Sequence, residues 1–208
     1  MKKAVFVLAV GLFVTAFFPQ EAAAKIDFTL GLKAGVSISN VSWSDDDGTE
    51  SSLVKPTFGV IGAFALSQTL AIQAEIDYVT MGESWEEEPY KTVETFNYLQ
   101  IPVLLRAYLV REGSTRPFLF AGPFIGILMS AHSKDYLDGE LDFDQDVKSF
   151  HSSTDFGAAF GAGTDFMVKK LKLFVDIRYH LGLSDTYTDS EKFSMKTRAL
   201  LFTAGIWF

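Results

Sequence analysis

The last nine residues read Leu200-Leu201-Phe202-Thr203-Ala204-Gly205-Ile206-Trp207-Phe208. Counting back from Phe208, every second residue is apolar, and because side chains alternate along a strand these residues share one face. In water, a terminal strand with such a face would invite edge-to-edge aggregation. In a membrane barrel the same face meets lipid and the strand closes the sheet. The pattern therefore predicts a membrane-spanning β-barrel.

The amino-terminus carries the pattern of a secretory signal peptide. Met1-Lys2-Lys3 is a short basic region, and an apolar segment runs from Ala4 to Phe18. Ala22-Ala23-Ala24 then supplies the small residues that signal peptidase recognises. The alternative is an uncleaved anchor, but the apolar segment is shorter than the ~20 residues that a spanning helix needs. We expect residues 1–24 to be removed, which leaves residues 25–208 as a single barrel domain.

The composition excludes several classes of protein. The chain has no cysteine, so it has no disulfide framework, thiol redox centre or zinc–thiolate site. Its formal net charge is −8, and we expect neither a nucleic-acid partner nor a cofactor. After the signal peptide, the longest apolar run, Pro117 to Met129, contains two prolines and two glycines and does not fit a membrane helix. For an exported apolar chain without membrane helices, the remaining solution is a barrel.

Eight segments alternate between apolar and polar residues in the way that strands do, and each has the ~9–11 residues needed to cross a membrane. The connections between them are alternately long and short, which is typical of an up-and-down barrel. We therefore predict an all-β, eight-stranded antiparallel transmembrane β-barrel. Its strands are expected at Phe28–Ser39, Pro56–Ser67, Leu70–Met81, Thr95–Val110, Pro117–Ala131, Asp155–Val168, Leu171–Ser184 and Thr197–Phe208.

The polar faces of three of these strands carry charged residues. The charges are Glu75, Asp77, Arg106, Asp176 and Arg178. A soluble, lipocalin-like barrel would place these faces outside, but eight strands enclose only enough room for a few side chains or one small ligand. The apolar set contains too many large side chains for that space, so we place lipid outside and the charges inside. Because unpaired buried charge is costly, we expect the two arginines to neutralise the three acids across the lumen.

Three segments resemble a known family. They are Asn97-Tyr98-Leu99-Gln100-Ile101-Pro102-Val103-Leu104-Leu105-Arg106, Pro117-Phe118-Leu119-Phe120-Ala121-Gly122-Pro123, and Asp155-Phe156-Gly157 followed by Phe160-Gly161-Ala162-Gly163. The chain is similar to the outer membrane protein β-barrel domain family, a porin-like group that includes PorT-type proteins. The resemblance implies an eight-stranded barrel of OmpA/OmpX type in the Gram-negative outer membrane. Because the family is functionally heterogeneous, it implies little about activity.

The long connections are strongly acidic. Asn40–Val54, Gly82–Glu94 and His132–Thr154 each carry a net charge of −4, whereas the short connections are basic. Loop solubility explains this distribution without any ligand. The more specific alternative is binding of divalent cations or of a basic partner at the cell surface. Asp142, Asp144 and Asp146 are the weak candidates for a cation site, although their segment fails the EF-hand pattern because Val147 replaces the turn glycine.

Histidines bear on the question of an enzyme. Some eight-stranded outer-membrane barrels modify lipid A with His, Ser and an acid, and His151-Ser152-Ser153 has a His-x-Ser spacing. No other part of such a motif is recognisable, and His180 is expected in the polar core. We predict no catalytic residues and no enzymatic activity.

Two functional hypotheses remain open: a structural or interaction protein with acidic surface loops, or a component of a PorT-like secretion or transport machine. With a lumen filled by side chains, neither is a wide diffusion pore. The expected partners are outer-membrane lipids and the barrel insertion machinery. Phe208, Ile206 and Phe202 form the expected assembly signal for that machinery.

Overall fold

The structure, a computed structural model, describes residues 28–43, 51–187 and 195–208. Within these ranges no helix is long and apolar enough to span a membrane. The predicted signal peptide, residues 1–24, lies outside the described residues. The described strands are β1 (Phe28–Trp43), β2 (Ser51–Ala65), β3 (Leu70–Glu87), β4 (Tyr90–Tyr108), β5 (Thr115–Leu137), β6 (Glu140–Asp146), β7 (Thr154–Val168), β8 (Leu171–Gly182) and β9 (Met195–Trp207), with a 3-10 turn, η1, at Lys148–Phe150.

Eight of these strands form a closed antiparallel ring. Each strand pairs with its neighbours in the order β1-β2-β3-β4-β5-β7-β8-β9, and β9 pairs back onto β1. The ring closes next to the chain terminus, where the Phe208 amide donates to the Leu30 carbonyl at 2.8 Å. This confirms the predicted fold class and the closing role of the last strand.

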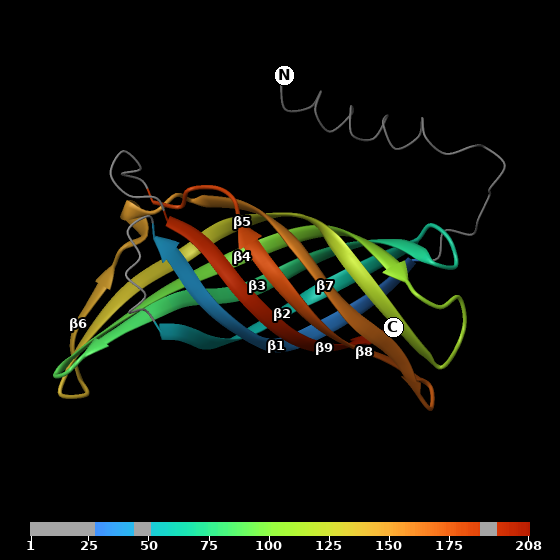
Figure 1. The fold of residues 1–208 in the computed structure, drawn as a ribbon, viewed down its shortest axis with the longest axis horizontal. Helices are drawn as coiled ribbons and strands as arrows, with labels where there is room; N and C mark the ends of the chain where they lie inside the picture. The colour runs from blue at the N-terminus through green and yellow to red at the C-terminus, as the bar shows by residue number, and fades with distance from the viewer. Residues whose placement is uncertain (1–27, 44–50, 188–194) are drawn as a thin grey trace, which may run out of the picture.

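The two ends of the barrel differ (Figure 1). One end, here called the turn end, holds the short connections β2–β3, β4–β5 and β7–β8 together with Phe208. The opposite end, here called the hairpin end, carries the β3–β4 and β5–β6 hairpins, which project beyond the ring.

The prediction of loops at the hairpin end is wrong in two places. Gly82–Glu94 is not a loop, because β3 and β4 stay paired out to Glu87 and Tyr90. His132–Thr154 contains the additional strand β6, which turns back along β5 through Asp138 and Gly139. Both turn residues have positive φ, 50° and 82°, which is the geometry that an Asp-Gly hairpin turn supplies. Part of the third predicted loop, residues 44–50, lies outside the described residues.

The outer surface of the ring is apolar. Large side chains on alternate strand positions remain exposed, and among them are Leu30, Leu32, Phe58, Val60, Ile76, Val103, Leu105, Leu119, Phe156, Phe160, Ile177 and Phe202. Fully burying a side chain of this size contributes about 1.5–3 kcal/mol relative to leaving it in water, so this many half-exposed apolar side chains are unfavourable in water. A surface of this kind suits hydrocarbon, and the soluble-barrel alternative is wrong.

Aromatic side chains fill much of the lumen by packing over glycines on the adjacent strand. Phe120 of β5 faces Gly161 of β7, and Phe174 of β8 faces Gly205 of β9. A Cβ at Gly161 would lie 2.7 Å from the Phe120 ring, and one at Gly205 would lie 2.3 Å from the Phe174 ring. The rings therefore lie over the backbone of the next strand, and only glycine leaves room for them. Between these aromatic layers the lumen is polar.

Candidate functional site

The central polar layer is an ion-pair cluster that spans the lumen. Arg178 of β8 donates to Glu75 of β3 at 2.7 Å, and these strands lie opposite each other, with three strands between them on either path around the ring. The same guanidinium donates two further bonds, 2.8 and 2.9 Å long, to Asp176. Lys33 of β1 donates to both Glu75 and Asp77. Bidentate and shared contacts of this kind are the geometry that makes buried charge tolerable.

The cluster fits because β2 carries glycine opposite Asp77. Gly59 pairs with Asp77 in the sheet, and a Cβ at Gly59 would lie 2.1 Å from the Asp77 carboxylate. Asp77 is fully buried, so its carboxylate has no route to solvent and depends on Lys33. The absence of one side chain on β2 thus makes room for an ion pair between its two neighbours.

A second ion-pair cluster lies nearer the turn end. Arg106 pairs with Asp165 at 2.5 Å, and its guanidinium lies 3.4 Å from the centre of the Phe118 ring. Tyr108 and Trp207 also donate to Asp165, at 2.8 and 3.2 Å. This single carboxylate therefore accepts hydrogen bonds from side chains of β4 and β9.

Gln73 connects the two clusters. Its side-chain oxygen accepts a 2.8 Å hydrogen bond from Arg106, and its amide nitrogen donates to Glu75. Within these two clusters the charges nearly balance, since Lys33, Arg106 and Arg178 face four acids: Glu75, Asp77, Asp165 and Asp176. Half-exposed Lys172, 3.7 Å from Asp165, supplies the fourth cation.

The five residues predicted as a lumenal network, Glu75, Asp77, Arg106, Asp176 and Arg178, are all buried, but their pairing differs from the prediction. Arg178 meets Glu75 and Asp176 as expected. The expected pairing of Arg106 with Glu75, Asp77 or Asp176 is wrong, because Arg106 binds Asp165. The prediction also omitted Lys33 as the partner of Asp77. Alternation could have revealed both omissions, since Lys33 and Asp165 each occupy the glycine-rich, inward face of their strand.

A third polar layer lies toward the hairpin end. His180 is fully buried, shares a 2.7 Å hydrogen bond with Gln100 and stacks on the Phe124 ring. Asp155 accepts hydrogen bonds from Ser184 and Thr197, both 2.6 Å long. His180 thus lies in the polar core, where the sequence predicted it.

Apolar clusters cap these polar layers. Toward the hairpin end lie the buried side chains Phe96, Tyr98, Leu128, Ala131, Val147 and Met195. Toward the turn end, Ile61, Phe174 and Trp207 pack together. The ion pairs are therefore enclosed at both ends, and the arrangement suits a packed plug rather than a solvated channel.

The three aspartates considered for a cation lie on the exposed strand β6. The part of the chain that the structure describes contains no group of three His, Cys, Asp or Glu side chains arranged to hold a metal ion. Asp144 is engaged by His132 at 3.2 Å and Lys134 at 3.4 Å, and Asp146 accepts a bond from the Lys148 amide. Asp142, Asp144 and Asp146 therefore do not form a three-carboxylate cation site.

His151 does not form a dyad with a serine. Its Nδ1 lies 2.9 Å from the Val147 carbonyl, and its ring packs against Phe96 and Tyr187. Burial lowers the pKa of the imidazole, which favours the neutral ring. Ser152, the residue between His151 and Ser153, donates to the Thr154 carbonyl. The His-x-Ser spacing lies at the end of η1 rather than on a strand, so the two side chains do not share a strand face.

Phe202 and Phe208 point outward and are exposed, and Ile206 lies on the same face of β9. This placement is compatible with the expected assembly signal, whose recognition stays a prediction.

Comparison with known families agrees with this geometry. The outer membrane protein beta-barrel domain matches residues 18–188 of the sequence. The chain belongs to that family. Its location is accordingly the Gram-negative outer membrane, and in the usual orientation of such barrels the turn end faces the periplasm and the hairpin end faces outward.

Known structures share the barrel architecture at low sequence identity. Neisserial surface protein A is 13% identical over 86% of this chain and 97% of its own, with a TM-score of 0.48. Ail, the attachment invasion locus protein of Yersinia pestis, is 13% identical over 88% of this chain and 100% of its own, with a TM-score of 0.46. The outer membrane protease OmpT of Escherichia coli is 8% identical over 88% of this chain and 93% of its own, at 0.40. No protein of curated function matches the sequence.

The buried position of Arg106 gives a stability prediction. Arg106→Ala leaves the buried Asp165 with only the more distant, half-exposed Lys172 as a cation, and breaking a buried pair typically costs about 3–5 kcal/mol. Lys91→Ala removes an exposed pair with Glu86 at the hairpin end, which should contribute only about 0–1 kcal/mol. Urea unfolding of both variants in detergent should show a clearly lower midpoint for Arg106→Ala alone. Equal, negligible shifts would place Arg106 in solvent.

Proposed function

We propose that the protein is a sealed, non-enzymatic outer-membrane barrel that anchors acidic β-hairpins at the cell surface for contact with a basic partner. The observation that carries the proposal is the lumen-spanning cluster of Arg178, Glu75 and Lys33, whose side chains are at most 1% exposed. A filled lumen has no room for a diffusing solute, so the functional surface must lie at the ends of the barrel.

The hairpin end supports an interaction role through its excess of negative charge. Glu83 is buried, and the other described acids at this end are Glu86, Glu87, Glu88, Glu94, Asp135, Asp138, Glu140, Asp142, Asp144 and Asp146, against the cations Lys91, Lys134 and Lys148. Burial, and then the nearby charge of Asp135, raise the pKa of Glu94. Clustered acids of this kind repel one another, and a basic partner would relieve the repulsion.

The hairpins are also built to present these charges rigidly. β3 and β4 remain paired through Glu86 and Lys91, and β6 alternates acids with the exposed apolar side chains Leu141 and Phe143. A paired strand holds its side chains at fixed spacing, which lowers the entropy that the hairpin itself loses when a partner binds. A basic protein surface with interspersed apolar residues fits this pattern better than a free divalent cation.

The non-enzymatic part of the proposal is supported by the engagement of the histidines. His151 and His180 are each buried and held by a carbonyl or amide oxygen. Neither is hydrogen-bonded to a nucleophile in the described residues. Mass spectrometry of lipid A from cells with and without the gene should show the same species, and a change in acylation would contradict this part.

A sealed lumen predicts that the barrel does not conduct ions. In planar bilayers the wild-type barrel should show no steady conductance under conditions in which a general porin conducts. Glu75→Ser/Arg178→Ser removes the lumen-spanning pair and should open measurable current. Glu86→Ser/Lys91→Ser removes an exposed pair at the hairpin end and serves as the matched control, which should stay silent. Steady wild-type current would contradict the sealed lumen.

The acidic hairpins predict salt-sensitive binding to polycations. The detergent-solubilised barrel should bind a lysine-rich peptide, and Glu86→Gln/Glu88→Gln/Asp142→Asn should weaken the affinity roughly 3- to 10-fold. Glu112→Gln, an acid at the turn end, should leave it unchanged. Equal loss in both variants would contradict the assignment to the hairpins. A stable complex with secretion components in a pull-down from native membranes would favour the PorT-like alternative instead.

A further inference from the structure

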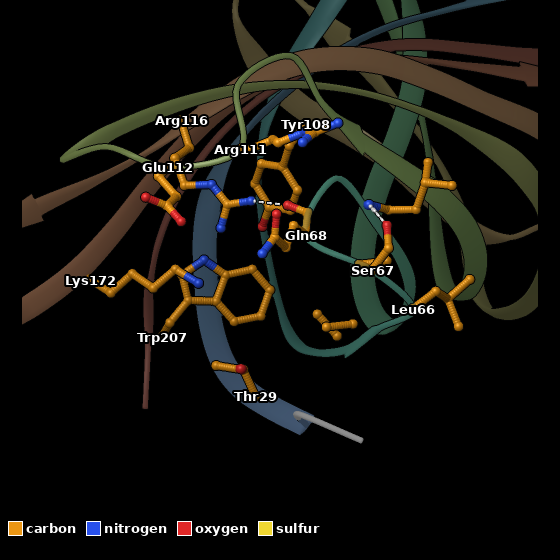
Figure 2. Close-up of a pocket in the computed structure, with 14 residues that line it drawn as sticks. Thr29, Leu66, Ser67, Gln68, Tyr108, Arg111, Glu112, Arg116, Lys172 and Trp207 are labelled. Atoms are coloured by element: carbon orange, nitrogen blue, oxygen red, sulfur yellow. Dashed lines mark hydrogen bonds between the residues drawn. The ribbon is translucent and has the colours of Figure 1, made fainter. Parts of the chain in front are cut away.

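A pocket opens inside the mouth of the barrel at the turn end (Figure 2). Its volume is about 440 Å³, which lies within the range of small-molecule sites. Its walls come from the ends of β1, β2, β3, β4, β5, β8 and β9 and from the β2–β3 and β4–β5 turns, the second of which carries Arg111 and Glu112. It lies at the opposite end of the molecule from the acidic hairpins and is independent of the function proposed for them.

The floor of the pocket is formed by the ion-pair cluster of Arg106 and Asp165. Tyr108, Lys172 and Trp207 line the pocket, and each of them also contacts Asp165, which is paired with Arg106 beneath them. Asp165 thus has its charge matched and its oxygens occupied. The floor therefore separates the pocket from the central lumen and does not itself neutralise Arg111 or Arg116.

Those cations are in excess. Arg111 and Arg116 line the pocket against the single acid Glu112, and Lys172 lies 3.7 Å from Asp165, which Arg106 already pairs at 2.5 Å. Within the described part of the chain, Arg111 has no hydrogen bond or ion pair. Arg116 donates to the Gln68 carbonyl at 2.6 Å, while its buried Nε finds no partner among the described atoms. In the lumenal clusters, by contrast, each arginine is ion-paired with an acid: Arg106 with Asp165, and Arg178 with Glu75 and Asp176.

The cations are also held in place by aromatic rings. The Arg116 guanidinium lies 3.9 Å from the centre of the Tyr108 ring, and the Lys172 ammonium lies 5.4 Å from that of Trp207. Figure 2 shows Lys172 beside the Trp207 indole, with Arg116 and Glu112 close by. Contacts of this type fix a cation without neutralising its charge. Apolar side chains, among them Leu66 and Ala63, complete the walls.

We infer that this pocket binds an oxyanion, a phosphate or a carboxylate, that is attached to an apolar group. The guanidinium groups of Arg111 and Arg116 supply the planar donors that such anions accept, and Lys172 adds a third charge. The Trp207 and Tyr108 rings and the alkyl walls receive the apolar part. In the orientation of the family the ligand enters from the periplasmic side.

The test measures binding of phenyl phosphate and phenylacetate to the mature barrel in a phosphate-free detergent. Trp43 and Trp85 lie on the hairpin-end halves of β1 and β3, so a Trp43→Phe/Trp85→Phe background leaves Trp207 as the fluorescent reporter in the pocket. Saturable binding of at least one probe is expected, weakening as salt rises because screening reduces the attraction. Benzyl alcohol, which lacks the anion, should not saturate the signal.

Matched variants separate the pocket from general positive charge. Arg111→Gln/Arg116→Gln should weaken binding about tenfold or more, because two charged donor groups are lost. Lys169→Gln/Lys170→Gln makes the same charge change in the β7–β8 turn, at the same end of the barrel but outside the pocket, and should leave the affinity within about twofold. Equal loss in both double variants, or no saturable binding of either probe, would overturn the inference. Lys172→Gln provides a second, single-site loss should the double variant fold poorly.

Nanodiscs of different lipid composition distinguish a lipid headgroup from a soluble oxyanion as the natural ligand. In nanodiscs that contain phosphatidylglycerol, a headgroup occupant would compete with the probe and weaken its apparent binding relative to phosphatidylcholine nanodiscs. Unchanged binding would assign the pocket to a soluble periplasmic oxyanion.

Discussion

Hydrocarbon offers no hydrogen bonds to a backbone, and this constraint determines the rest of the structure. Every strand must pair on both sides, so the sheet has to close, and it does so where the Phe208 amide reaches Leu30. Closure around eight strands leaves a narrow lumen. Because the apolar residues are required on the lipid side, the alternate residues, many of them polar, must share that narrow space.

A narrow lumen lined by charges is stable only when the charges pair. Arg178, Glu75 and Lys33 form such a set between strands that are not neighbours, and Gln73 extends it to Arg106 and Asp165. These ion pairs connect strands on opposite sides of the barrel, and they also exclude solvent from the lumen. One consequence is that the two ends of the barrel are chemically separate, with an acidic hairpin end and a basic pocket at the turn end.

The sequence predicted the parts of this arrangement that depend on strand period. Alternation identified the eight strands, and it placed Glu75, Asp77 and Arg178 inside. Pairing across the lumen could not be predicted, because it depends on which strands face each other and how they are staggered. Arg106 and Asp165 are 59 residues apart and meet only once β4, β5 and β7 have registered.

The structure of the hairpin end was harder to predict because a strongly polar segment can be either a loop or an exposed strand. β6 is entirely exposed and mostly acidic, so its composition resembles a loop although its backbone is a strand. The Asp138-Gly139 turn was the available signal. A register shift opposite Asn97 and Tyr98 also changes which residues of β5 face inward: Leu128 is buried before it and Ala131 after it. One extra residue of this kind interrupts simple alternation and leaves no mark in the composition.

The central claim is that Glu75 and Arg178 interact across the lumen. A double-mutant cycle on Glu75→Gln and Arg178→Gln, read as urea unfolding free energy in detergent, measures that interaction directly. For residues in contact we predict a coupling of at least about 1 kcal/mol, with the double variant more stable than the sum of the single losses. Additivity within about 0.5 kcal/mol would mean that the two side chains do not meet, and would contradict a lumen closed by charge pairs.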